Sequence, residues 1–267
     1  MAQRFKLNQG NQAELSNNSA LVQRLRKILQ KKHRKSFDEF LVEGPSLVEE
    51  GLKAKQLTHI FYTQDFLDRR ELIAKAKIVG IPTYLISNKT LKSISETASP
   101  AGILAISNLK ISLLSKLAVK NFSQIIYLDE VQDPGNAGTI IRGAAAFGFS
   151  AVIFSIDSVD PTNLKVARAS AGSIFQIPIF LSESLKELDE WGFEINIAKA
   201  DGNLELLEAA VKDRQVWVFS NEARGSRSSY DNYQSVRIPI KTQTESLNVA
   251  QAASILMWQL SNKINAK

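Results

Sequence analysis

The chain has 267 residues, of which 44% are hydrophobic and 22% are charged, and its 33 Lys and Arg residues exceed its 27 Asp and Glu residues. These values are typical of one large or two modest folded domains. No apolar run approaches the roughly 18 to 20 residues that span a bilayer, so we expect no membrane segment. The absence of Cys and the presence of only two His residues exclude a disulfide framework, a thiolate nucleophile and a cysteine-based metal centre. A His-rich metal site or a Ser-His-Asp triad is also disfavoured, and we expect no bound metal.

The first 20 residues are polar and lack the apolar core of a secretory signal. Together with the missing cysteines, this feature predicts a cytoplasmic location.

The first predicted helix is basic and lies around residues 21–29. Leu21, Val22, Leu25 and Leu29 repeat at three- and four-residue spacing, which would bury one face and turn the cations outward. An exposed row of cations is typical of binding to a phosphate backbone, although a solvated face that only keeps the protein soluble has the same pattern. The candidate RNA contacts are Arg24, Lys27, Lys31, Lys32, Arg34 and Lys35.

The rest of the first half predicts a small α/β unit, because short apolar runs alternate with helical stretches. Predicted strands cover 58–63, 81–87 and 99–107, and a charged helix runs from about 66 to 79. An amphipathic basic segment follows the last of these strands. The predicted domains are residues 1–110, a linker at 111–121, and residues 122–267.

The second half contains runs rich in β-branched and aromatic residues, separated by helical or turn segments. This pattern is typical of βαβ units and predicts a doubly wound, largely parallel sheet with buried strands. The predicted strands cover 123–130, 151–157, 173–180, 194–200 and 215–222. Open α/β sheets bind their ligands at the ends of such strands, so three loops there are candidate sites.

The first candidate loop leads into a helix that carries Arg142 among small residues. A guanidinium in such surroundings is accessible and can hold a phosphate or polarise a hydroxyl, although an ordinary surface ion pair is the alternative. Close helix packing accounts for Gly143 and the alanines after it. The glycines Gly135 and Gly138 lack the spacing of a dinucleotide-binding fingerprint.

The second and third candidate loops follow later strands. Ser220, Asn221 and Glu222 come directly after an apolar strand, where backbone amides and a carboxylate can bind the polar end of a small ligand, although any exposed loop has a similar composition. Asn248 is placed to cap the last helix, with Gln251 three residues on. Capping alone accounts for Asn248, but the start of this helix would also attract a carboxylate or phosphate.

Three motifs in this order resemble those of the SpoU, or TrmH-type, RNA 2'-O-methyltransferases of the SPOUT class. They are N-x-G-x-I-I-R at 136–142, S-N-E-x-x-G at 220–225, and I-P-I followed by S-L-N-V, which spans 238–249. The resemblance covers about residues 122–267, and the first half is similar to the substrate-binding domain of many members. It implies an α/β fold with a C-terminal parallel-sheet SPOUT domain that contains a trefoil knot, preceded by a smaller α/β substrate-binding domain.

The resemblance also implies the cofactor, the partners and the site. S-adenosylmethionine would be held in the knotted loops, RNA would be the substrate, and the chain would act as a homodimer. The implied catalytic residues are Arg142, Asn136, Glu222, Ser246 and Asn248. The implied cofactor-binding residues are Ser220, Asn221, Glu222, Ile238, Pro239, Ile240, Leu247 and Asn248. The chain departs from many relatives in having Ser220 in place of Gly, and Ala223 and Ser226 in the second motif.

The implied reaction agrees with the composition. Methyl transfer from a sulfonium to a ribose 2'-oxygen needs placement of the two reactants and activation of a weakly acidic hydroxyl, without a metal or a covalent intermediate. Arg142 would act either as a base in a perturbing environment or by stabilising the developing alkoxide. We therefore expect an S-adenosylmethionine-dependent RNA 2'-O-ribose methyltransferase, with ribosomal RNA favoured because the extra N-terminal domain is common among its ribosomal members. The alternatives are a transfer RNA 2'-O-methyltransferase, a non-catalytic RNA-binding protein that keeps the fold, and a nucleotide-dependent oxidoreductase.

Overall fold

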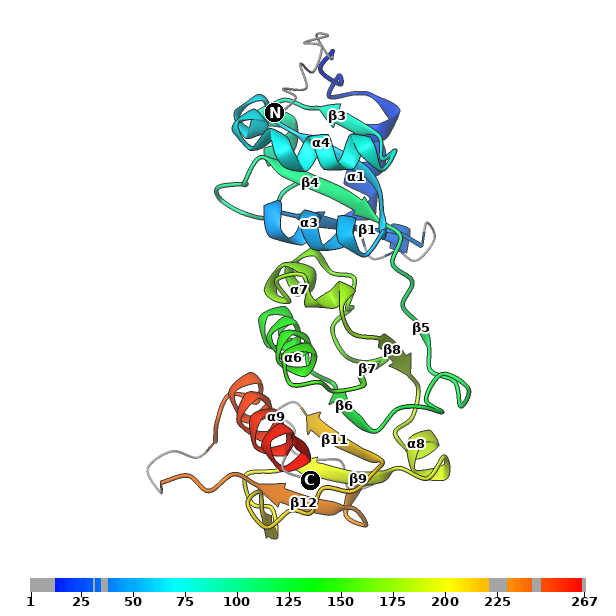
Figure 1. The fold of residues 1–267 in the computed structure, drawn as a ribbon, viewed down its shortest axis with the longest axis vertical. Helices are drawn as coiled ribbons and strands as arrows, with labels where there is room; N and C mark the ends of the chain where they lie inside the picture. The colour runs from blue at the N-terminus through cyan, green and yellow to red at the C-terminus, as the bar shows by residue number, and fades with distance from the viewer. Residues whose placement is uncertain (1–12, 31, 35–37, 221–229, 242–245, 266–267) are drawn as a thin grey trace, which may run out of the picture.

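The computed structural model describes residues 13–30, 32–34, 38–220, 230–241 and 246–265. These residues form two domains that follow one another along the long axis of the molecule, each built around its own β-sheet (Figure 1). In the described residues, no helix combines the length and the apolar character that crossing a membrane requires.

The N-terminal domain contains a four-stranded mixed sheet. Its strands are β1 (Phe40–Glu43), β2 (Leu57–Tyr62), β3 (Thr83–Leu85) and β4 (Ile103–Ser107), in the order β1-β4-β2-β3. β4 is antiparallel to both of its neighbours, and β2 and β3 are parallel. The buried residues of these strands are largely β-branched or aromatic, as the sequence pattern predicts.

Helices cover both faces of this sheet. They are α1 (Ala20–Ile28), α3 (Pro45–Lys53), η1 (Gln64–Arg69), α4 (Arg70–Ile78) and α5 (Asn88–Lys92). Ser19 caps α1, and Val22, Leu25 and Ile28 bury its apolar side against Phe61 and Leu104. The predicted basic helix is therefore present, with its apolar stripe in the core.

The C-terminal domain is an eight-stranded sheet in which every recorded strand pairing is parallel. Its order is β10-β12-β9-β11-β6-β7-β8-β5. The strands are β5 (Ser112–Leu113), β6 (Gln124–Asp129), β7 (Ala151–Ser155), β8 (Ile179–Ser182), β9 (Glu194–Ala198), β10 (Leu204–Glu205), β11 (Gln215–Ser220) and β12 (Gln234–Arg237). β11 lies between β6 and β9, so strands that are far apart in the sequence lie side by side in the sheet.

The helices of this domain divide between the two faces of the sheet. They are α6 (Pro134–Ala146), α7 (Leu164–Ala169), η2 (Ser173–Phe175), α8 (Lys186–Glu190) and α9 (Val249–Asn265). α6, α7 and α9 pack on one face, where alternate residues of β6, β7 and β11 meet them, and α8 covers the other face (Figure 1). Burial on both faces explains why the strands read as continuous apolar runs.

Two segments differ from the sequence expectation. The predicted strand at 173–180 begins instead as the 3-10 helix η2, because Gly172 has a φ of +99° and starts a turn that buries Ile174 and Ile177. The expected linker 111–121 contains β5, which pairs with β8 as the edge strand of the C-terminal sheet.

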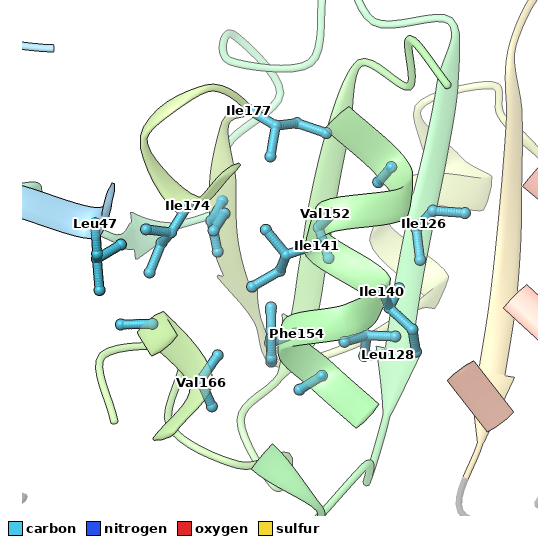
Figure 2. Close-up of a cluster of buried hydrophobic side chains, with 14 of the residues drawn as sticks. Leu47, Ile126, Leu128, Ile140, Ile141, Val152, Phe154, Val166, Ile174 and Ile177 are labelled. Carbon is cyan, nitrogen blue, oxygen red and sulfur yellow. The ribbon is translucent and has the colours of Figure 1, made fainter. Parts of the chain in front are cut away.

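One hydrophobic cluster runs through both domains. Figure 2 shows Ile140 and Ile141 of α6 lying over Ile126 and Val152 of the sheet, and the same cluster reaches Leu47 of α3 through Ile174. The N-terminal domain is therefore joined to the helical face that carries α6 and α7.

Candidate active site

Two asparagines from distant parts of the chain meet where α6 and α9 begin. Nδ2 of Asn248 donates a hydrogen bond of 3.1 Å to Oδ1 of Asn136. Oδ1 of Asn248 accepts from the backbone N–H groups of Ala250 and Gln251 at 2.9 and 3.3 Å. The predicted capping role of Asn248 is confirmed, and the same side chain also ties the start of α9 to the first turn of α6.

Tight packing on two sides fixes the position of α6. A Cβ added to Gly138 would lie 2.4 Å from Cβ of Ala169 and 2.6 Å from the carbonyl oxygen of Val166, both on α7. A Cβ added to Gly143 would lie 2.4 Å from Cε of Met257 on α9. The packing role predicted for Gly143 is thus confirmed.

Arg142 lies on the exposed side of α6, in a row with Gly135, Thr139 and Ala146. Its side chain makes no hydrogen bond or ion pair within the part of the chain that the structure describes. It lies six positions after Asn136, which corresponds to about 9 Å along the helix axis. Among the described residues, the alternative of an ordinary surface ion pair is not observed, so no described side chain occupies the guanidinium.

A cavity of about 460 Å³ opens at the carboxyl ends of β9, β11 and β12. Its size is within the roughly 300–1,000 Å³ of small-molecule and cofactor sites. Of the predicted site residues that the structure describes, five line it: Ser220, Ile238, Ile240, Ser246 and Leu247. Pro239 is exposed between two lining residues, and Asn248 follows the lining residue Leu247. Neither Asn136 nor Arg142 lines the cavity; Asn136 adjoins it through its hydrogen bond to Asn248, and Arg142 lies further along the same helix.

The cavity is mainly apolar and contains a polar atom that lacks a partner. Oγ of Ser220 is buried and makes no hydrogen bond in the described residues. Its strand is regular up to this point, because Ser220 pairs in register with Asp129 of β6. A side chain is therefore tolerated here, and its buried hydroxyl has no hydrogen-bond partner in the described residues to account for its burial.

Sequence reasoning missed one wall of the cavity. Ala198, Lys199, Ala200 and Asp201 line it where β9 ends. The turn is close to β12, because a Cβ on Gly202 would lie 2.6 Å from the carbonyl carbon of Val236. Small residues followed by Gly at the carboxyl end of a parallel strand are the signal that could have indicated this wall.

Comparison with known proteins identifies the family and the fold. The model of the SpoU rRNA methylase family matches residues 123–258, and that of the MRM3-like substrate-binding domain matches residues 19–105. The chain belongs to the SpoU rRNA methylase family. The matched regions contain the strands of the two sheets described above, except β5 and the end of β4.

Relatives of this SpoU chain extend over nearly its whole length. The 23S rRNA (guanosine(2553)-2'-O)-methyltransferase RlmP of Bacillus subtilis is 31% identical over 240 residues, which cover 88% of the chain and 93% of the relative. An uncharacterized tRNA/rRNA methyltransferase of Synechocystis is 30% identical over 253 residues, 91% of each chain. The AdoMet-bound rRNA methyltransferase of Sinorhizobium meliloti superimposes with a TM-score of 0.80 at 26% identity, covering 94% of this chain and 97% of that structure.

The six cations predicted to bind RNA have different environments in this SpoU protein. Lys27 and Lys32 are exposed. Arg24 donates to Oε2 of Glu39 through Nε at 3.1 Å and Nη2 at 2.8 Å, with 40% of its side chain exposed. Arg34 is only 8% exposed and pairs with Asp160 of the C-terminal domain, so its assignment to an exposed patch is wrong. Its burial follows from a partner that is 126 residues away in the chain.

Four predicted site residues of the SpoU protein lie outside the described residues. They are Asn221 and Glu222 of the second motif, and Lys31 and Lys35 of the basic segment. Among the residues that are described, no group of three or more His, Asp or Glu side chains is arranged to bind a metal.

Proposed function

We propose that this chain is an S-adenosylmethionine-dependent RNA 2'-O-ribose methyltransferase that acts on ribosomal RNA. The observation that carries the proposal is the hydrogen bond between Asn136 and Asn248. It joins the helix of Arg142 to the segment that forms one wall of the cavity. The family membership and the relative RlmP, which is named as a 2'-O-methyltransferase, support the same reaction.

The cavity fits the cofactor. The apolar side chains of Ile238, Leu247 and Val249 would hold the adenine ring, and the unpartnered hydroxyl of Ser220 would bind a polar group of the cofactor. Lys199 and Asp201 provide charged partners at the opposite wall for the zwitterionic methionine end. When bound, S-adenosylmethionine supplies a methyl group that is activated by its positive sulfur. The trefoil knot remains a prediction from the family resemblance.

Arg142 would act on the substrate rather than on the cofactor, because it is exposed and does not line the cavity. A guanidinium beside the ribose would hold the adjoining phosphate and stabilise the negative charge that develops on the 2'-oxygen. Asn136 and Asn248 would keep the two helices in register while the oxygen is aligned with the methyl group. We favour this electrostatic role over proton abstraction, since a guanidinium stays protonated at neutral pH.

We also propose that two copies of the chain form the active enzyme. α9 presents a row of exposed residues that includes Ile255 at 40% and Trp258 at 54% exposure. The helix that carries this row packs on the helix of Arg142, because the buried side chain of Met257 of α9 meets Gly143 of α6. A second copy placed on this surface would bury the apolar side chains and help to enclose Arg142.

A ribosomal RNA substrate also supports the expected cytoplasmic location, where the enzyme would meet it.

Replacing Arg142 tests the catalytic assignment. We expect Arg142→Ala to lower kcat for methylation of 23S ribosomal RNA by at least about a hundredfold, in line with the loss of one charge-stabilising group. The affinity for S-adenosylmethionine, measured by calorimetry, should stay within about twofold, because Arg142 lies outside the cavity. Thr139→Ala, one turn earlier on the same exposed side, is the matched control and should retain activity. Normal turnover of Arg142→Ala would refute the assigned role.

The same assays separate the alternative functions. Failure of wild-type protein to bind S-adenosylmethionine would favour a non-catalytic RNA-binding protein, and thermal stabilisation by NAD would favour an oxidoreductase. Mapping of 2'-O-methyl groups in a deletion strain and its parent distinguishes ribosomal from transfer RNA, because the missing modification identifies the substrate.

A further inference from the structure

Arg34 joins the end of the basic helix to the other domain. Its Nη2 atom lies 2.8 Å from Oδ2 of Asp160, and its Nε atom donates to Oγ1 of Thr162 at 3.3 Å. Its Nη1 atom donates to the carbonyl oxygens of Ile28 and Leu29 at the C-terminal end of α1. One buried guanidinium therefore contacts both domains.

The segment that receives Arg34 is hydrogen-bonded to the segment that precedes the helix of Arg142. Oδ1 of Asp160 accepts from the backbone N–H and the hydroxyl of Thr162, so the turn is rigid on its own side. One residue earlier, the N–H of Val159 donates to the carbonyl oxygen of Val131 at 2.9 Å. Val131 lies two residues before Asp133, which caps α6. The ion pair is thus connected, through one backbone hydrogen bond and a few residues of chain, to the start of the helix that carries Arg142.

α7 provides a second connection along the same interface. It lies between α6 and the N-terminal domain in Figure 1. Leu164, at its start, belongs to the core that contains α1, while Val166 and Ala169 contact α6 at Gly138. Beyond α7, Nε2 of Gln176 donates to Oε2 of Glu50 at 3.0 Å. The two domains therefore meet on a packed surface, with Arg34 as a buried charged contact within it.

We propose that Arg34 is a positioning residue that sets the orientation of the N-terminal domain relative to α6. RNA held by the N-terminal domain would then present one ribose to Arg142. The inference rests on the proposed function, and it assigns Arg34 to the domain interface instead of the RNA surface. A buried ion pair suits this role. The cost of desolvating the two charges offsets most of their Coulombic attraction, so the pair adds little stability, while its geometry specifies one arrangement. Lys could not replace it fully, since one ammonium cannot reach both carbonyls and the carboxylate in the same fork.

The first test measures domain orientation without any activity. The chain has no Cys, so Lys92→Cys in the N-terminal domain and Asp213→Cys in the C-terminal domain provide two exposed labelling sites. We expect single-molecule energy transfer between the two labels to give one narrow distribution in the otherwise unchanged protein and a broad one after Arg34→Met. Lys75→Met removes an exposed ion pair with Glu49 inside one domain and is the matched control, with an unchanged distribution.

The second test separates positioning from RNA contact. For Arg34→Met we expect kcat on ribosomal RNA to fall by about tenfold to a hundredfold, with methyl groups also appearing on neighbouring riboses, because a small misplacement of reactants has a large effect on rate. The Kd for RNA and its salt dependence should stay close to wild type, and Arg34→Lys should recover part of kcat. Asp160→Asn should reproduce the effect with a folded protein if Arg34→Met proves unstable.

Three outcomes decide the proposal. An unchanged energy-transfer distribution in both Arg34→Met and Asp160→Asn would overturn it. A weaker Kd with a shallower salt dependence and normal kcat would also overturn it, because Arg34 would then contact RNA directly. If wild-type protein shows no methyl transfer while the distribution still broadens in the variant, the proposed function fails and the assignment of Arg34 to domain orientation stands.

Discussion

At the scale of single residues, burial separates cations that have the same charge and similar sequence surroundings. Arg34 and Lys32 lie two positions apart, yet Arg34 is buried in a domain interface and Lys32 is exposed. Arg142 is exposed without an internal partner among the described residues. A buried cation needs a specific acceptor, whereas an exposed one can bind a mobile polyanion such as RNA. Lys27 and Lys32 are therefore the described cations of the basic segment that we retain as RNA contacts.

His59 is expected to make stability depend on pH. Its ring stacks on Phe61 and Tyr84 at centroid distances of 6.4 and 6.1 Å. Burial lowers the pKa of His59, and the charge of Arg24 lowers it further, against an opposing effect of Glu39. His59 therefore binds a proton more tightly in the unfolded chain than in the folded protein. Its contribution to the free energy of unfolding is complete above about pH 6.5 and is lost as the pH falls through the pKa of the folded state.

Urea unfolding at pH 7.5, 6.5 and 5.5 measures this effect. We expect the midpoint of wild-type protein to fall between pH 6.5 and 5.5, and the fall to be smaller in His59→Phe, which keeps an aromatic ring in the stack. An identical pH dependence in both proteins would contradict the assignment to His59.

At the scale of elements, α6 is the helix that contacts the other parts of the candidate site. α7 and α9 approach it at Gly138 and Gly143, and Asn248 bonds to its first turn. The two contacts differ in what they meet. Gly138 faces the backbone and a short side chain of α7, so these atoms can move only if the whole helix moves. Gly143 faces the flexible end of the Met257 side chain, which can move by itself.

This difference predicts unequal effects of the same substitution. Gly138→Ala would force α7 away from α6 and should lower the free energy of unfolding by about 1–3 kcal/mol, the usual cost of overpacking. Gly143→Ala is the matched control, where movement of Met257 and the better helix propensity of Ala should leave stability within about 1 kcal/mol. Denaturant unfolding of both variants checks the prediction, and equal losses would contradict the proposed rigidity of the α6–α7 contact.

At the scale of the whole molecule, the two domains expose surfaces of different character, one basic and one apolar. The N-terminal domain presents Lys27 and Lys32, and α9 of the C-terminal domain presents Ile255 and Trp258 next to the helix of Arg142. Large exposed apolar side chains that cluster beside a site are typical of a protein interface. The proposed homodimer depends on the second surface.

Replacing Trp258 tests the proposed dimer. We expect Trp258→Glu to sediment as a monomer and to lose most methyltransferase activity, because a charge cannot be buried in the interface without a partner. Ile78→Glu alters a residue that is 84% exposed in the other domain and is the control, which should sediment like the wild type. A dimeric and active Trp258→Glu would place the interface elsewhere.

The sequence predicted features that depend on neighbours in the chain. Strands such as β6 and β11 are recognisable as apolar runs, and the basic helix is recognisable by the spacing of its apolar residues. The capping role of Asn248 is predictable from the helical residues that follow it. These features follow from side-chain periodicity and local hydrogen bonding, which adjacent residues control. The family resemblance added the order of the motifs and the implied reaction.

Only the tertiary structure decided which of these residues face each other. It brought Asn136 to Asn248, added the turn after β9 to the cavity, began the expected strand at 173–180 as a 3-10 helix, and buried Arg34 against Asp160. The two side-chain contacts, between Asn136 and Asn248 and between Arg34 and Asp160, leave no local signal, because the partner residues are remote in the chain and their approach depends on how whole helices and strands pack. Periodicity predicts that a side chain faces inward or outward along its own element, whereas its partner is determined by the packing of the entire fold.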